Sequence, residues 1–167
     1  KFLFDDKEPV LHGTKVGIST IAILHLYETL LTTDIDWQKA ENYKFHKESW
    51  ENLMMKTYGI AGPSVIALEN KVHKNEPTGQ ATRLKVIREN WVSICQTIEE
   101  SLIPLGLIQK TLESMGAPYK PSQIGVDDEL LGISIIVAKE VRDRYTLLQL
   151  LWDLGLLKEF SELLPNF

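Results

Sequence analysis

His12 is the residue of this sequence best placed to do chemistry. Two glycines, Gly13 and Gly17, follow it one helical turn apart, and a long apolar run over residues 18–31 comes next. An imidazole can bind a metal ion or transfer a proton near neutral pH, and glycines let a ligand or another backbone approach closely. Because no partner ligand stands at metal-site spacing, the residues alone favour a structural role for His12.

The other candidates for metal or phosphate binding are weaker. His25, His46 and His73 lack metal-ligand spacing to one another. We therefore expect core or surface roles for them, with a hydrogen-bonded, buried imidazole at His25. Lys15 lies about one turn from His12 and can attract a phosphate as a point charge. A solvated lysine is the interpretation that we favour.

A cluster near the end of the sequence, Arg142, Arg144 and Tyr145, has the composition of an anion site. The same residues are also typical of a helix end, where arginines cap carbonyl groups and pair with acids such as Asp143 or Asp153. We favour this structural interpretation.

Other catalytic motifs are missing from the sequence. The glycines beside His12 lack the preceding strand and the spacing of a dinucleotide-binding loop, and residue order indicates no Ser-His-Asp or Cys-His arrangement. The adjacent acids Asp127-Asp128 and Glu99-Glu100 would point in different directions on a helix, so they indicate solvated faces.

Helices must position these residues. Apolar side chains cover almost every side of the segment 18–31, which predicts a central helix buried inside a domain. Lys15, His25 and Glu28 interrupt the segment, so we do not expect a membrane span. No window alternates well enough to predict a strand. Seven to nine helices are expected in all, the later ones over residues 36–43, 49–58, 64–74, 84–102, 105–115, 127–144 and 147–154, with a last turn at 160–164 before Pro165.

Local signals indicate where several helices begin and end. Asp34 or Asp36 is a candidate N-cap, and Thr146 with Gln149 has the pattern of a capping box. Lys139, Arg142 and Arg144 would complement the helix dipole in the last turn of the segment 127–144. Loops are expected over residues 5–9 and 75–79, and glycine stops are expected at residues 59, 116 and 155.

Composition excludes some classes of protein. The length of 167 residues suits one domain. A net charge of −5 without a dense basic patch speaks against a nucleic-acid binder. The single cysteine, Cys95, fits a reducing compartment, so we expect a cytoplasmic protein with Cys95 as buried filler. The first residue is Lys and no signal sequence precedes the helices, so we expect a piece of a longer protein.

Two motifs at opposite ends of the sequence resemble one family. His-Gly-x-x-Val-Gly-Ile at residues 12–18 continues as Leu-His-Leu-Tyr-Glu at 24–28, and Arg-x-Arg-Tyr-Thr at 142–146 continues as Asp-Leu-Gly-Leu-Leu at 153–157. Both are similar to the C-terminal helical domain of sn-glycerol-1-phosphate dehydrogenases. These enzymes belong to the iron-containing alcohol dehydrogenase superfamily, with glycerol dehydrogenase and dehydroquinate synthase as relatives. The resemblance covers essentially the whole chain but only the second half of such an enzyme.

The resemblance implies a fold, a metal and a reaction. Residues 1–167 would form a single all-α, metal-binding domain, and the N-terminal nucleotide-binding domain that holds NAD(P) would be absent from this chain. A catalytic divalent metal, zinc above nickel or iron, would be held by one aspartate and two histidines, and His12 falls on the second histidine. The intact enzyme, a homo-oligomer, would reduce dihydroxyacetone phosphate to sn-glycerol 1-phosphate for phospholipid biosynthesis.

The resemblance leaves alternatives open. Where many relatives carry Glu after His-Gly, this chain has Thr14, which leaves the choice of substrate within the superfamily open. Glycerol dehydrogenase or another iron-type alcohol dehydrogenase is the nearest alternative, and a non-catalytic helical interaction domain is another. On any of these readings the chain alone should be inactive, and its face around His12 should be open or apolar.

Overall fold

The computed structural model describes residues 10–164, and within that range the chain is an all-α domain without strands. The loop expected at residues 5–9 and the end expected at Pro165 lie outside the described residues. The helices are α1 (His12–Leu31), α2 (Trp37–Asn42), α3 (Lys47–Tyr58), α4 (Gly62–Val72), α5 (Pro77–Glu89), α6 (Trp91–Ser101), α7 (Leu105–Ser114), α8 (Asp128–Ala138), α9 (Leu147–Asp153) and α10 (Leu157–Leu163), with 3₁₀ turns at Gly59–Ala61, Pro121–Ile124 and Lys139–Val141.

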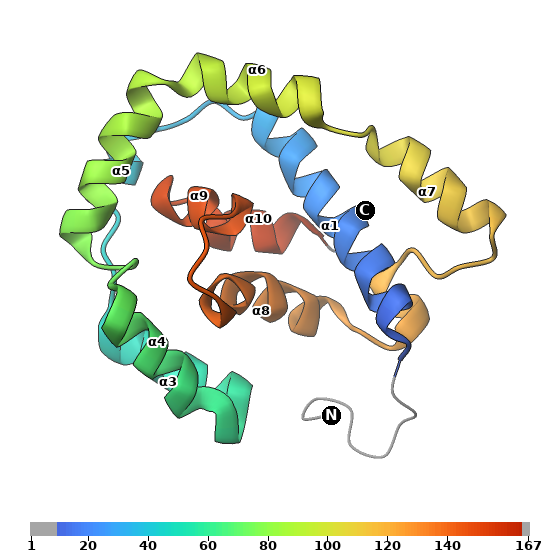
Figure 1. Ribbon diagram of the computed structural model, residues 1–167, viewed down its shortest axis with the longest axis horizontal. Helices are drawn as coiled ribbons and strands as arrows, with labels where there is room; N and C mark the ends of the chain where they lie inside the picture. Colours follow the sequence, from blue (N-terminus) through green and yellow to red (C-terminus); the bar gives the residue numbers. More distant parts are fainter. Residues whose placement is uncertain (1–9, 165–167) are drawn as a thin grey trace.

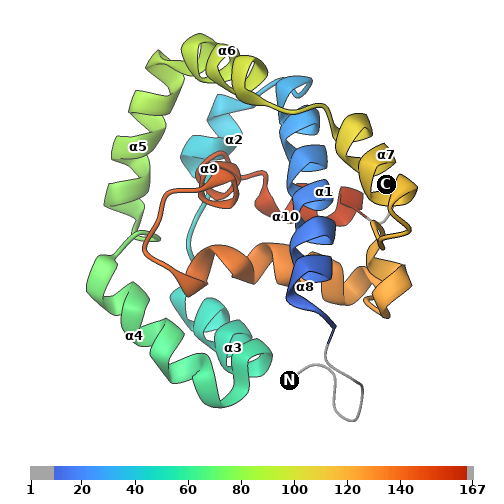
Figure 2. The same ribbon diagram turned by 45° about the vertical axis from the view of Figure 1, so that its right-hand side comes forward.

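The helices enclose a short inner layer. α5, α6 and α7 follow one another around the outside, and α1 runs diagonally across the molecule inside that arc (Figure 1). The α3 and α4 pair packs as a hairpin at one end, as the turned view also shows (Figure 2). α8, α9 and α10 fill the space between the hairpin, the arc and α1. Across the described part of the chain, none of the helices combines the length and apolar character that a membrane crossing requires.

The centre of the core is α9. All seven of its residues are buried, from Leu147 to Asp153. Its leucines and Trp152 form the main apolar cluster with side chains of α1, α5, α8 and α10. Such a helix is surrounded on every side, so its polar members, Gln149 and Asp153, require hydrogen-bond partners inside the protein. Gly155 ends the helix in the left-handed region (φ 69°), as the sequence predicts.

α1 ends at Leu31 as predicted, but it begins at His12, before the apolar segment 18–31, and it is less buried than predicted. Its fully buried residues are Ile18, Ile21, Ala22, Leu24, Leu26 and Leu30. Val16 is 49% exposed, and the first turn around His12 is open to solvent. The prediction that the segment 18–31 is buried on almost every side is also wrong, because Ser19 and Thr20 are exposed and His25 is half-buried. At Gly17 an added Cβ would lie 3.5 Å from a methyl group of Leu112, so this glycine faces α7, whereas Gly13 faces open space.

The long amphipathic helix predicted over residues 84–102 is two helices. Pro77 already begins α5, and the chain leaves helical geometry at Asn90 (φ −114°, ψ 12°) before α6 begins. The Asn90 side-chain amide also donates to the carbonyl of Val86 (2.8 Å), a local bond that competes with helix continuation. No residue of α6 is fully buried. Cys95 on α6 is accordingly half-buried, which corrects the prediction of a buried thiol.

The helix predicted over residues 127–144 ends earlier. α8 stops at Ala138, and Lys139–Val141 forms a 3₁₀ turn. Lys139 is therefore buried and does not complement a helix end from solvent, while Arg142 and Arg144 lie beyond the helix. The turn buries the charged residues Lys139 and Glu140 and leaves the apolar Val141 51% exposed, the reverse of what residue type predicts.

Local signals were right at several termini and wrong at one. Asp36 caps α2 by accepting a hydrogen bond from the Lys39 amide (2.9 Å), and glycines 59 and 116 follow α3 and α7 with positive φ. Thr146 precedes α9, but its side chain makes no capping bond. The capping box is therefore wrong, because Gln149 is buried and bonds to Asp153 (3.4 Å).

Candidate functional site

His12 is the first residue of α1 and lies exposed at its N-terminal end. The preceding residue, Leu11, provides no side-chain cap, and the first turn contains no acid. No hydrogen bond or ion pair joins the imidazole to another of residues 10–164, so both ring nitrogens are open to a ligand. The helix start therefore presents a nitrogen donor and uncapped amides on an accessible surface.

A shallow groove along α1 begins at His12. Lys15, Val16, Ser19, Thr20 and Ile23 line it with His12. Lys15 and Ser19 also line an adjoining cavity of about 220 Å³ over α8. Lys15 is exposed and forms no ion pair within the described residues, so its ammonium is available to an anion in this groove. The face around His12 is open, as expected.

The described residues supply only one donor for a metal at this end of the domain. No group of three His, Cys, Asp or Glu side chains within residues 10–164 could hold a metal ion. His25 is half-buried in the middle of α1, His46 precedes α3, and His73 follows α4, with its Nδ1 2.8 Å from Glu76. His12 thus fits the position of a single exposed ligand. A complete site requires donors from outside the described residues.

A buried cluster of charged groups joins the α3 and α4 hairpin to α8 and α9. The Lys139 ammonium donates to Asn75 Oδ1 and to Glu140 Oε1, each at 2.6 Å, and lies 4.8 Å from the ring centre of Trp152. Glu140 also accepts a bond from Trp50 Nε1 (3.0 Å). Burial lowers the pKa of Lys139 to about 8, although the Glu140 carboxylate opposes the shift. The side chains of Lys139, Glu140, Asn75 and Trp50 are all joined by hydrogen bonds, which indicates a structural role for these four.

The same cluster continues to Glu69 on α4. Burial raises the pKa of Glu69, and its Oε2 atom has no hydrogen-bond partner in the described part of the protein. Its Oε1 atom accepts from the Asn75 amide (2.7 Å). Burial also pushes the pKa of Glu140 upward, but Lys139 and Lys74 hold it below its usual value. Lys74 adds hydrogen bonds to the carbonyls of Lys139 and Arg142, and so fixes the chain that leaves α8.

A second buried ion pair stands between α5 and α9. Arg83 donates from Nε (2.8 Å) and from one terminal nitrogen (2.7 Å) to the two oxygens of Asp153, which is fully buried. The Tyr145 hydroxyl donates to the same carboxylate (2.9 Å). Hydrogen bonding to Asp153 raises the pKa of Arg83, and burial raises that of Tyr145. The ring of Tyr145 thereby attaches the segment that precedes α9 to the core.

The expected pairing of Arg142 and Arg144 is wrong. Asp153 pairs with Arg83 and Tyr145, and neither Arg142 nor Arg144 forms an ion pair with another residue of the described chain. Residue order carries no signal for the Arg83 pair, because 70 residues separate its members. The buried groups Lys139 and Glu140 were likewise missed.

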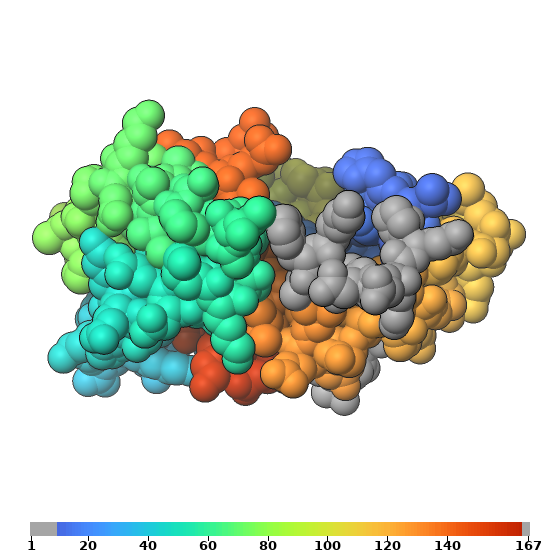
Figure 3. Space-filling model, turned by 90° about the horizontal axis from the view of Figure 1, so that it is seen from below, coloured from blue at the N-terminus to red at the C-terminus, as the bar shows by residue number. Residues whose placement is uncertain are grey.

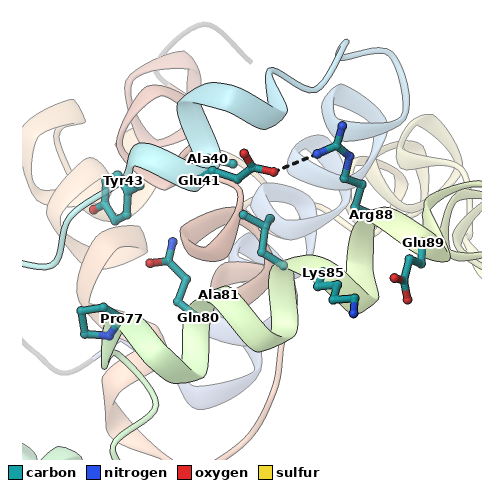
Figure 4. A pocket seen from close by; sticks show the side chains of 10 residues that line it. Ala40, Glu41, Tyr43, Pro77, Gln80, Ala81, Lys85, Arg88 and Glu89 are labelled. Atoms are coloured by element: carbon teal, nitrogen blue, oxygen red, sulfur yellow. Dashed lines mark hydrogen bonds and ion pairs between the residues drawn. The ribbon is translucent and has the colours of Figure 1, made fainter.

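A cavity of about 640 Å³ lies between α2 and α5. Arg88 and Glu41 face each other across it and form an ion pair of 2.8 Å (Figure 4). Both side chains are more than half exposed, so the pair contributes little to stability. His12 does not line this cavity.

The comparisons with known proteins agree with the family resemblance. The chain is 24% identical to a glycerol-1-phosphate dehydrogenase (NAD(P)+) of Geobacillus stearothermophilus over 155 residues, which are 92% of this chain and 30% of that protein. It is 26% identical to the enzyme of the same name from Geobacillus thermodenitrificans over 149 residues, 89% of this chain and 28% of that protein.

The similarity runs along nearly the whole chain and confirms the resemblance to glycerol-1-phosphate dehydrogenases. The chain spans less than a third of the length of these relatives, a smaller share than the half that the resemblance implied. No family profile matches the chain, and no solved structure matches it significantly. The relationship to dehydrogenases therefore rests on these two relatives and on the all-α fold.

Proposed function

We propose that this chain is the helical, metal-side domain of an NAD(P)-dependent oxidoreductase that reduces dihydroxyacetone phosphate to sn-glycerol 1-phosphate. One observation carries the proposal. The chain matches two enzymes named glycerol-1-phosphate dehydrogenase along 92% and 89% of its own length. The nucleotide-binding domain would be supplied by further polypeptide, and the intact enzyme would be a cytoplasmic homo-oligomer. The isolated chain would be inactive, since it supplies one metal ligand.

His12 would contribute one of three metal ligands, the others being an aspartate and a histidine outside this chain. Its exposed, unpartnered imidazole at the open end of α1 supports this role. A divalent metal, zinc above nickel or iron, would polarise the ketone oxygen when bound. Lys15 lies in the same groove and would attract the substrate phosphate.

Activity should be tested on a polypeptide that joins this chain to its nucleotide-binding domain. The proposal predicts oxidation of NADH or NADPH with dihydroxyacetone phosphate. His12→Ala should abolish turnover, because a metal with one ligand fewer is held weakly. Lys15→Gln should raise KM for the phosphorylated ketone more than it lowers kcat. His73→Asn is the matched control, because His73 lies apart from the groove and Asn tolerates its positive φ.

Two other outcomes of this activity test would favour the alternative functions. Turnover of free glycerol with NAD+, without turnover of the phosphorylated ketone, would identify a glycerol dehydrogenase. A folded, full-length protein that binds dinucleotide but turns over neither substrate, and retains its properties after His12→Ala, would contradict the proposal and leave an interaction domain.

A further inference from the structure

The segment that precedes α9 carries two arginines without acidic partners. Arg142 and Arg144 are exposed and form no ion pair within residues 10–164. Both line a cavity of about 590 Å³ bounded by α1 on its other side, where Ile23 and Tyr27 stand. Asp143, the acid between them in sequence, does not line the cavity. Lys139 also lines the cavity, but it pairs with Glu140. The two arginines are thus cations that face the cavity without an acidic partner among the described residues, in a chain whose net charge is −5.

Hydrogen bonds to the protein interior hold the backbone that carries these arginines. The Arg142 carbonyl accepts bonds from the Lys74 ammonium (3.2 Å) and from the Arg144 amide (3.0 Å). Between Arg144 and α9, the Tyr145 hydroxyl is bonded to the buried carboxylate of Asp153. Asp153 and Glu140 are engaged beneath the segment, whereas Asp143 is exposed but does not line the cavity. A held backbone reduces the entropy lost when a ligand binds.

The chemistry of the cavity favours a phosphorylated ligand with an apolar body. Two guanidinium groups suit the oxygens of a phosphate or diphosphate, which they bind through paired N–H donors. The Thr146 hydroxyl makes no capping bond and lines the same cavity. Ile23, Tyr27 and Leu148 form its apolar wall. A cavity of this size is typical of a small-molecule site, larger than a single phosphate needs.

The cavity is a different place from the groove at His12. Ile23 lines both and is the residue where they meet. The α-helical rise places Ile23 about 16 Å from His12 along α1. A three-carbon phosphate has six bonds of about 1.5 Å in its chain and cannot span that distance. Figure 3 shows the start of α1 and the segment around residues 142–146 along the same edge of the molecule, with a hollow between them.

We propose that Arg142 and Arg144 form a binding site for the phosphate groups of a nucleotide-sized ligand whose apolar part lies against Ile23, Tyr27 and Leu148. The proposal does not depend on dehydrogenase activity, because every group it uses belongs to this chain. It predicts that a nucleoside diphosphate binds more tightly than inorganic pyrophosphate, since the pyrophosphate lacks a body to cover the apolar wall.

The test is a titration of this chain with ADP and with inorganic pyrophosphate, followed by calorimetry and by NMR of backbone amides. We expect saturable binding of ADP, with shifted amides confined to residues 139–148 and the facing part of α1. The double variant Arg142→Gln, Arg144→Gln should weaken ADP binding by about tenfold or more through loss of two charge-assisted contacts. Arg88→Gln, which removes an exposed arginine from another cavity, should leave it unchanged.

Three results would overturn the proposal: no saturable binding, the same affinity in the double variant, or equal affinities for ADP and pyrophosphate. Tyr27→Ala provides a second readout, because it should weaken ADP binding while leaving that of pyrophosphate unchanged. The thermal unfolding midpoint of each variant shows whether it remains folded. Since binding is measured without turnover, failure here is distinct from failure of the proposed dehydrogenase function.

Discussion

The buried pair between Arg83 and Asp153 makes a quantitative test of the fold. In Asp153→Asn the amide NH₂ replaces one acceptor oxygen and faces an N–H donor of the Arg83 guanidinium in either orientation, because Arg83 donates to both oxygens of Asp153. The carboxylate is fully buried and the Arg83 side chain is 26% exposed. The variant therefore leaves a largely buried cation without its counter-charge.

The expected loss in free energy of unfolding follows from the geometry. Breaking one side of a buried pair costs about 3–5 kcal/mol, and the partial exposure of Arg83 places Asp153→Asn near the lower limit, about 3 kcal/mol. For a domain of this length that corresponds to a fall in Tm of about 6–12 °C. Tyr145→Phe removes one hydrogen bond to the same carboxylate and should cost about 1–2 kcal/mol.

Urea denaturation followed by circular dichroism measures both values. A double-mutant cycle of Asp153→Asn with Arg83→Met isolates the interaction between the two side chains, and we expect a coupling of about 1–3 kcal/mol. A loss below about 1 kcal/mol for Asp153→Asn, or a coupling near zero, would refute the argument that this pair fixes α5 to α9.

Three further predictions concern other parts of the core. The pKa of Lys139 is about 8 in the folded chain and about 10.4 in an unfolded one, so between these pH values the unfolded chain binds more protons. The free energy of unfolding should therefore rise from pH 8 to pH 10 by up to about 2 kcal/mol. Urea titrations at a series of pH values should show that this rise is absent from Lys139→Met. Gly62→Ala should lower Tm, because its Cβ would lie 3.0 Å from backbone and 2.9 Å from a sulfur atom of α3, whereas Gly106→Ala faces open space and should not; equal Tm values would contradict the packing. Trp50→Phe should cost about 2 kcal/mol through loss of the indole bond to Glu140, and an unchanged urea midpoint would show that the bond is not formed in solution.

The predictable parts of the fold are those decided within a few residues. The end of α1 follows from its apolar run, the N-cap of α2 follows from Asp36, and the ends of several helices follow from glycine. Each depends on backbone geometry or on a hydrogen bond between near neighbours. Such signals can be recognised from a short stretch of sequence alone.

The parts that the sequence did not predict depend on contacts between distant segments. Lys139 is adjacent to Glu140, but its other close partner, Asn75, lies 64 residues away. The local sequence around this buried lysine therefore looks the same as that of an exposed lysine at a helix end. Asp153 was predicted to pair with the nearby arginines, but it pairs with Arg83, which lies on another helix. The break at Asn90 was hidden because the apolar period continues through it.

The candidate site is divided in the same way. His12 was found because its type and its place before an apolar helix are local features, and the structure puts it on an open surface. Its proposed role rests on the family resemblance, since residues 10–164 contain no group of three side chains that could hold a metal ion.

Metal content is the most direct test of the central proposal. The measurement is the zinc, nickel and iron bound per chain by the protein that includes the nucleotide-binding domain, with His12→Ala and the control His73→Asn. We predict one divalent metal per chain, lost in His12→Ala and kept in His73→Asn. Metal bound equally well without His12, or no metal in a folded protein of full length, would contradict the account of His12 as a ligand.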